Sequence, residues 1–165
     1  MKVEKTFTVQ ASPQTVWDFA KDPEKMAPCI PGCKDITAVD ATRYKAQVAV
    51  KVGPISAKFN LDLEIVEETP PVEIISKTRG EEGTRASMLT ADNVVRLRAN
   101  DDGSTEVYCR SESSITGRLG KYGAGMMMKK ADAIWEKLAE NVCRAIEGTA
   151  ENRGQTPADN MREHA

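Results

Sequence analysis

The sequence contains a single histidine, His164, which stands one residue from the end of the chain in a polar stretch. Ser-His-Asp and Cys-His mechanisms, and most zinc sites, need an imidazole that is held in a packed site. A histidine in a polar tail is not expected to supply one. The scarcity of histidine therefore argues against these kinds of catalytic centre.

Zinc-site cysteine spacing and phosphate-binding glycine motifs are also missing. We interpret the four cysteines, Cys29, Cys33, Cys109 and Cys143, as reduced thiols used as small apolar residues. Neither GxxxxGK[ST] nor a strand-bound GxGxxG is present. The formal net charge of −2 gives no global basic field for a nucleic acid. We therefore predict no catalytic residue, no metal site and no nucleic-acid partner.

Long hydrophobic runs are absent as well. No segment approaches the run of about 20 apolar residues that spans a bilayer, and the first residues lack the apolar core of a signal peptide. We therefore expect a cytoplasmic protein, with peripheral contact at the inner face of the cell membrane left open. The length of 165 residues suits one domain with its own core.

Alternating apolar and polar residues dominate the first two thirds of the chain. Residues 2–10 predict a strand, and Ser12-Pro13 and Asp22-Pro23 then predict the N-termini of two short helices. Six further strands are predicted at 34–39, 44–52, 55–67, 72–79, 84–99 and 105–115, separated by turns rich in glycine, proline and aspartate.

Residues 116–148 predict a long amphipathic helix. Its apolar residues recur mostly every three or four positions, at Leu119, Tyr122, Met126, Ile134, Leu138, Val142 and Ala145. Glycines between 117 and 125 weaken its first part, so either the regular helix begins near Gly125 or its first turns are loose. That part is either a flexible flap over a cavity mouth or a close approach of the helix to the sheet. Residues 149–165 have little to bury and predict a disordered tail.

Together these elements predict an α+β fold with a helix on one face of an antiparallel sheet. The sheet is expected to have seven strands curved around the long C-terminal helix, with two short helices after the first strand. We expect this domain to span residues 1–148.

The last predicted strand has one face of mixed chemistry. If that face is turned inward, Ser111 and Ser113 place two hydroxyls in an otherwise apolar interior beside Val107, Cys109 and Ile115. Either the serines are half solvated, or they are the few polar groups that orient a ligand in an apolar pocket. Neither has a base beside it in the sequence, so neither is predicted to be a nucleophile.

Methionine and positive charge gather at the start of the long helix. Three consecutive methionines cannot all face one side of a helix, because neighbours lie about 100° apart. An exposed methionine beside lysines suits a membrane surface or an acidic partner protein, although a plain solvated face is the alternative. The residues concerned are Arg118, Lys121, Met126, Met127, Met128, Lys129 and Lys130.

A succession of short motifs runs along the chain to about Gly148. They are Ser12-Pro13 through Val16-Trp17-Asp18, Pro31-Gly32-Cys33, residues 52–59 (VGPISAKF), 67–71 (EETPP), 102–105 (DGST) and 117–123 (GRLGKYG). In this order they resemble the family of the carbon monoxide dehydrogenase G subunit, within the START-like (SRPBCC, helix-grip) superfamily. The resemblance implies a hydrophobic cavity between sheet and helix. It also implies association with a molybdenum hydroxylase, in membrane recruitment or in handling a quinone electron acceptor.

The leading hypothesis is a non-enzymatic accessory protein that binds a hydrophobic, quinone-like or lipid ligand between sheet and helix and serves a molybdenum hydroxylase. No covalently bound cofactor is predicted. A small cyclase or hydratase that uses a cavity carboxylate or tyrosine is one alternative, and a pure membrane-recruitment factor without a small ligand is another.

The candidate residues form two groups. Trp17 is a candidate wall of the ligand site, with core packing as its alternative role. The candidate ligand-binding residues are Trp17, Phe59, Leu61, Leu63, Ser111, Ser113, Tyr122, Met126 and Met127. The candidate contacts to a membrane or a partner are Arg118, Lys121, Met128, Lys129 and Lys130.

Overall fold

The computed structural model describes residues 1–83 and 85–154, with side chains up to residue 148. Seven antiparallel strands form one sheet in the order β1-β7-β6-β5-β4-β3-β2. The strands are β1 (Lys2–Val9), β2 (Cys33–Ala38), β3 (Arg43–Val52), β4 (Ile55–Thr69), β5 (Glu73–Glu82), β6 (Ser87–Ala99) and β7 (Thr105–Gly117). This sheet confirms the predicted fold class.

The helices follow the predicted order. After β1 come α1 (Pro13–Ala20), α2 (Pro23–Met26) and a single 3₁₀ turn, η1 (Ala27–Cys29). A second 3₁₀ turn, η2 (Leu119–Tyr122), precedes the long helix α3 (Ala124–Gly154). The start of α1 is capped by Ser12, whose Oγ accepts a hydrogen bond from the backbone N–H of Thr15 at 3.2 Å. Asp22 caps α2 by accepting from the N–H of Glu24 at 3.0 Å.

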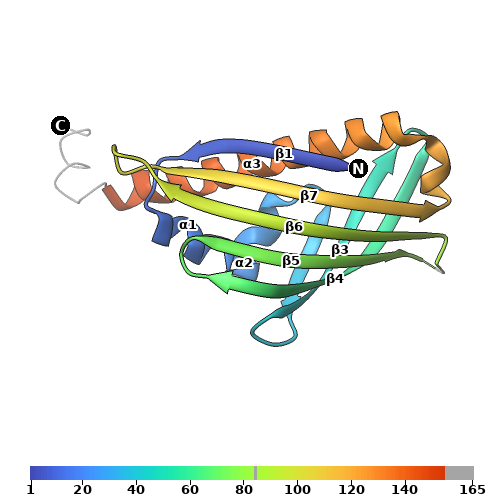
Figure 1. Ribbon diagram of the computed structural model, residues 1–165, viewed down its shortest axis with the longest axis horizontal. Helices are drawn as coiled ribbons and strands as arrows, with labels where there is room; N and C mark the ends of the chain where they lie inside the picture. Colours follow the sequence, from blue (N-terminus) through green and yellow to red (C-terminus); the bar gives the residue numbers. More distant parts are fainter. Residues whose placement is uncertain (84, 155–165) are drawn as a thin grey trace, which may run out of the picture.

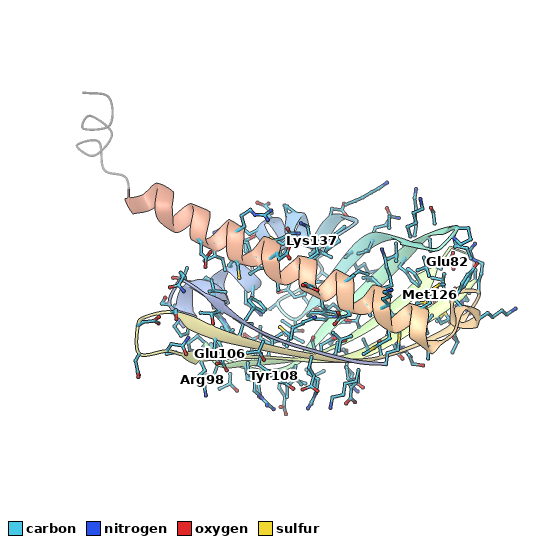
Figure 2. The ribbon with its side chains drawn as sticks, turned by 90° about the horizontal axis from the view of Figure 1, so that it is seen from above. Glu82, Arg98, Glu106, Tyr108, Met126 and Lys137 are labelled. Carbon is cyan, nitrogen blue, oxygen red and sulfur yellow. The ribbon has the colours of Figure 1, made fainter. Side chains whose placement is uncertain are left out.

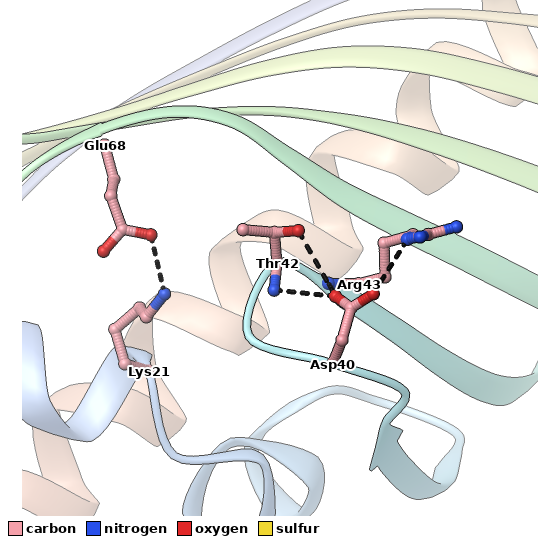
Figure 3. A network of polar contacts seen from close by, with 5 residues as sticks. All are labelled: Lys21, Asp40, Thr42, Arg43 and Glu68. Atoms are coloured by element: carbon pink, nitrogen blue, oxygen red, sulfur yellow. Dashed lines mark hydrogen bonds and ion pairs between the residues drawn. The ribbon is translucent and has the colours of Figure 1, made fainter.

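Polar contacts also fix the turn between β2 and β3 (Figure 3). Asp40 accepts from the backbone N–H groups of Thr42 at 3.0 Å and Arg43 at 2.9 Å. These bonds, chiefly the one from Thr42, lower the pKa of the Asp40 carboxyl. Close by, Lys21 at the end of α1 pairs with Glu68 of β4 at 2.9 Å, which ties the short helices to the sheet.

One face of the sheet is covered by α3. The helix runs along β1, and β3 crosses the direction of β1, β7 and β6 at a steep angle (Figure 1). Arg98, Glu106 and Tyr108 point away from α3 on the opposite, outer face (Figure 2). An ion pair between Lys5 of β1 and Asp132 of α3, 2.8 Å long, joins the helix to the edge of the sheet.

Two separate buried clusters lie between the sheet and the helices. The first lies at the α1 end and contains Val9, Val16, Trp17, Cys29, Leu97, Val107, Cys109, Val142 and Ile146. The second lies at the η2 end and contains Val52, Ala57, Phe59, Leu119 and Met127. We call them the α1-end cluster and the η2-end cluster.

The boundaries around α3 refine the sequence prediction. The regular helix begins at Ala124, which confirms the alternative that placed its start near Gly125. The segment before it is held to the sheet, because the Arg118 N–H donates to the carbonyl of Ala86 at 2.7 Å and Leu119 is only 1% exposed. At its other end α3 continues past Gly148 to Gly154, so the predicted tail boundary at 149 is corrected. Residues 155–165, including His164, lie outside the described residues.

Candidate functional site

The inner face of the sheet is only half buried at its centre. Five side chains form one row across five strands, in register from β3 to β7: Tyr44, Leu63, Thr78, Ala91 and Ser113. Every one of them keeps part of its surface exposed. We call this set the middle row.

The two ends of the same face are packed. Two rows toward η2, the register brings Val48, Phe59, Glu82 and Ser87 side by side, and all four are buried. Toward α1, Leu97 and Val107 pair across β6 and β7 and are also buried. Half-buried side chains also occur at both ends, but there they pack against one of the two clusters, whereas Tyr44, Leu63 and Ala91 of the middle row pack against neither. An apolar guest at the centre can therefore add contacts that the protein does not make itself.

A polar network lies directly beside the middle row. The Ser111 hydroxyl donates to Asn93 Oδ1 at 2.7 Å. Asn93 Nδ2 donates to Thr78 Oγ1 at 3.1 Å and lies 3.5 Å from Ser76 Oγ. The network spans β7, β6 and β5, and Ser111 and Ser76 are buried while Thr78 and Asn93 are half buried. Few polar groups in mainly apolar surroundings are typical of a small-molecule site.

The face of α3 that joins the two clusters is apolar but only half buried at its centre. Met127 belongs to the η2-end cluster and Val142 to the α1-end cluster. Helical spacing places Ala131 and Ile134 on the same face between them, and both remain half buried. The centre of this helix face is therefore half buried, as the middle row of the sheet is.

The structure brings four of the predicted ligand-binding residues to this centre. Leu63 and Ser113 belong to the middle row, and Leu61 and Ser111 lie in the rows on either side of it. The predicted inward face of the last strand is confirmed, because Val107, Cys109 and Ser111 are all buried.

The other predicted ligand-binding residues lie elsewhere. Phe59 and Met127 belong to the η2-end cluster, with Tyr122 packed against it. Trp17 is 5% exposed in the α1-end cluster, where it packs as a core residue. Met126 is 46% exposed and points to solvent rather than into the interior.

The predicted contact residues surround the start of α3. Met128 is 37% exposed, Lys121 and Lys129 are exposed, and Lys130 is half buried. Arg118 pairs with the buried carboxylate of Glu82, which also accepts from the Ser87 hydroxyl at 2.7 Å. Arg118 therefore has a structural role that the sequence did not reveal.

Sequence reasoning missed Tyr44, Thr78, Ala91 and Asn93. Asn93 carried a signal, because it interrupts the inward series Leu89, Ala91, Val95 and Leu97 of β6 with a polar side chain. A polar residue on a buried face needs hydrogen-bond partners, so it marks either a network or a site.

A groove of about 950 Å³ crosses the opposite side of the sheet. Its lining includes all five middle-row residues together with neighbouring side chains that point away from α3, among them Lys45, Asp62, Lys77, Arg79 and Asp92, and no described residue of α3. Because strand side chains alternate between faces, this groove lies on the outer face. It is distinct from the space predicted between sheet and helix.

The chemistry available to the described side chains is limited. Burial raises the pKa of the Cys109 thiol to about 12, so this thiol stays protonated at neutral pH. All four cysteines are free thiols. Within residues 1–83 and 85–154 no group of three or more His, Cys, Asp or Glu side chains could hold a metal ion. In the same part of the chain no helix is long and apolar enough to cross a membrane.

The comparison with protein families decides the assignment. The family model that describes the G subunit of carbon monoxide dehydrogenase (CoxG) matches residues 6–147. The chain belongs to the CoxG family. Among curated proteins, no sequence matches this CoxG-family chain.

Solved structures show that the CoxG-family chain shares the START-like fold. A conserved protein from Geobacillus kaustophilus is 19% identical with a TM-score of 0.83, covering 90% of this chain and 97% of its own. A START superfamily protein from Mycobacterium smegmatis is 17% identical with a TM-score of 0.71, covering 90% and 98%. The Zhui aromatase/cyclase from Streptomyces sp. R1128 is 17% identical with a TM-score of 0.62, covering 94% and 96%.

Proposed function

We propose that this CoxG-family protein is a non-enzymatic accessory protein that binds a hydrophobic ligand between the middle row and α3. The observation that carries the proposal is that all five middle-row residues are half buried, while the apolar ones among them pack against neither of the two clusters at the ends of the inner face. A bound apolar molecule would remove this surface from water, which is the main source of affinity in such sites.

The ligand that we propose is quinone-like or a lipid, and the partner is a molybdenum hydroxylase of the carbon monoxide dehydrogenase type. The description of the family as the G subunit of carbon monoxide dehydrogenase supports this partner. Such a partner needs an electron acceptor, and a carrier with an apolar interior suits one that is poorly soluble in water.

The chemistry of the interior supports a carrier rather than an enzyme. The Ser111 hydroxyl donates to the amide oxygen of Asn93, which is not a base that could activate it. The Cys109 thiol is held neutral by burial, as its raised pKa shows, and a neutral thiol is a poor nucleophile.

Extraction of the purified protein with organic solvent, followed by mass spectrometry, tests the proposal. We expect a quinone or a lipid in the extract of the wild-type protein. Ala91→Phe fills the middle row and should remove most of this molecule. Thr90→Phe adds the same side chain one residue away on the outer face and should leave it unchanged. No apolar molecule in the wild-type extract, together with no uptake of added quinone, would contradict the proposal.

We also propose that the start of α3 contacts the inner face of the membrane. Met126 and Met128 are 46% and 37% exposed beside Lys129, which suits insertion of thioethers among anionic headgroups. Flotation with vesicles that contain phosphatidylglycerol should carry the wild-type protein upward. The double variant Lys121→Glu/Lys129→Glu should lose this binding, whereas Lys45→Glu/Lys77→Glu on the outer face should keep it. Equal flotation of both variants would exclude this surface.

A further inference from the structure

The hydrogen bonds of the polar network have a direction. Ser111 can only donate to Asn93 Oδ1, because an amide oxygen is purely an acceptor. Asn93 Nδ2 then donates to Thr78 Oγ1 at 3.1 Å, so Thr78 acts as the acceptor in that bond. Each step passes from a donor on one strand to an acceptor on the next, from β7 through β6 to β5.

This direction leaves the hydroxyl hydrogens of Thr78 and Ser76 unused at the β5 end, because Asn93 Nδ2 is the donor to both oxygens. A threonine hydroxyl has one hydrogen to donate in addition to the lone pairs that accept. Among the hydrogen bonds of the described residues, none uses the Thr78 hydroxyl as a donor. Turning the Asn93 amide over reverses the network and leaves the Ser111 hydrogen unused instead. In both arrangements the network ends in an O–H group that has no acceptor among the residues that the structure describes.

The arrangement in which Ser111 donates to Asn93 places an unused hydrogen on Thr78, where a guest can reach it. Ser76 and Ser111 are 8% and 6% exposed, but Thr78 is half buried in the middle row. Its register neighbours are Leu63 on β4 and Ala91 on β6, both apolar. A ligand that packs on Leu63 and Ala91 would therefore bring its own atoms against the Thr78 hydroxyl.

We propose that Thr78 donates a hydrogen bond to a carbonyl-type acceptor on an otherwise apolar ligand. Asn93 and Ser111 are positioning residues: Asn93 Nδ2 donates to Thr78 Oγ1 and leaves the Thr78 hydrogen for the guest, and Ser111 orients the Asn93 amide by donating to its Oδ1. This inference rests on the proposed ligand uptake and adds the residue that would recognise a carbonyl group on the ligand.

The network also determines which apolar molecules are rejected. A hydrocarbon that covers Thr78 would remove its O–H from water and offer no acceptor, and leaving a buried donor unpaired is costly. A carbonyl compound of the same shape avoids that cost. The site should therefore distinguish a quinone from the matching hydrocarbon although both bury similar apolar surface.

Equilibrium dialysis with a matched pair of probes tests the inference. The probes are 2,3-dimethyl-1,4-naphthoquinone, which has no free ring position for attack by a thiol, and 2,3-dimethylnaphthalene. We expect the wild-type protein to bind the quinone about tenfold more tightly than the hydrocarbon, the effect of one hydrogen bond in a buried site. Thr78→Val should abolish this preference by weakening quinone binding alone.

Thr90→Val is the matched control. It makes the same change in side chain on the neighbouring strand, but on the exposed outer face. This variant should keep both affinities. Infrared spectra of the bound quinone give an independent readout, because a donated hydrogen bond lowers the C=O stretching frequency. We expect the lowered frequency in the wild-type and Thr90→Val proteins and its return toward the free value in Thr78→Val.

The outcomes separate the two proposals. Tight binding of both probes with no preference, or a preference that survives Thr78→Val, overturns the role of Thr78 while ligand uptake stands. Binding of neither probe by the wild-type protein overturns the proposed function and this inference with it. Loss of both affinities in a folded Thr78→Val protein also contradicts a specific hydrogen bond, since packing alone would then explain the effect.

Discussion

Burial sets the chemistry of Cys109 on the inner face of β7. Its thiol has a pKa raised from 9.0 to about 12, because the charged thiolate is penalised in the apolar interior. The unfolded thiol ionises near pH 9, so ionisation favours the unfolded chain as the pH rises. The stabilising effect of this protonated thiol is therefore complete below about pH 9 and is lost between about 9 and 12.

We expect the free energy of unfolding to fall by at most about 1.4 kcal/mol per pH unit from this one group in that interval. Denaturant unfolding at several alkaline pH values measures the slope. Cys109→Ala removes the thiol and should give a flatter dependence on pH. The same slope in both proteins would show that other groups cause the alkaline loss.

Glu82 and Arg118 form a pair whose acid is buried and whose base is partly exposed. The Glu82 side chain is 6% exposed and the Arg118 side chain 45% exposed. Arg118→Ala leaves the carboxylate without its charged partner, and we expect a loss of roughly 1–3 kcal/mol in unfolding free energy. Chemical denaturation measures this loss.

The outer pair Arg98–Glu106 supplies the control for Arg118. The Arg98 side chain is 73% exposed, so Arg98→Ala should change the unfolding free energy by less than about 1 kcal/mol. Similar losses of unfolding free energy in Arg118→Ala and Arg98→Ala would mean that the burial of Glu82 does not strengthen its ion pair.

At the scale of elements, η2 links the sheet to α3, and Leu119 is its buried residue. Leu119 is 1% exposed in the η2-end cluster, and its N–H donates to Ser87 Oγ at 3.0 Å. We expect Leu119→Ala to cost about 2–5 kcal/mol and to expose residues 117–125 to proteases. Limited proteolysis with mass spectrometry locates the cleavage. Met126→Ala, at a side chain that is 46% exposed, should be cut no faster than the wild type.

Local patterns predicted the elements because the causes of these elements are local. Ser12-Pro13 and Asp22-Pro23 start α1 and α2 through caps that span a few residues. The sequence predicted that β5 ends at residue 79 and that β6 begins at residue 84, whereas β5 ends at Glu82 and β6 begins at Ser87. The difference arises because Glu82 and Ser87 pair across the turn, and because Glu82 binds Arg118 from a distant part of the chain. Contacts between residues so far apart in the chain cannot be predicted from the local sequence pattern.

The candidate site was predictable only on the strand whose inward face the sequence revealed. Alternation identified Ser111 and Ser113 as inward, and the structure places both at the half-buried centre. Asn93 and Thr78 reach Ser111 only through the register of three strands. A period of two gives the faces of each strand but not which residues meet across strands.

At the scale of the molecule, the inner face of the sheet has a buried cluster at each end and the half-buried middle row between them. The α1-end cluster and the η2-end cluster attach α3 to the sheet at two separated places. This arrangement lets the centre stay incompletely packed without loss of the fold. The groove of about 950 Å³ on the outer face is charged and lies on the far side of the sheet from this centre.

The central claim is that a ligand lies between the middle row and α3, and nuclear Overhauser contacts from a bound quinone to methyl groups locate it most directly. We predict contacts from 2,3-dimethyl-1,4-naphthoquinone to the methyl groups of Leu63, Ala91 and Ile134. Contacts only to Val66 or Val39, which are 49% and 54% exposed, would place the ligand outside this centre and contradict the account.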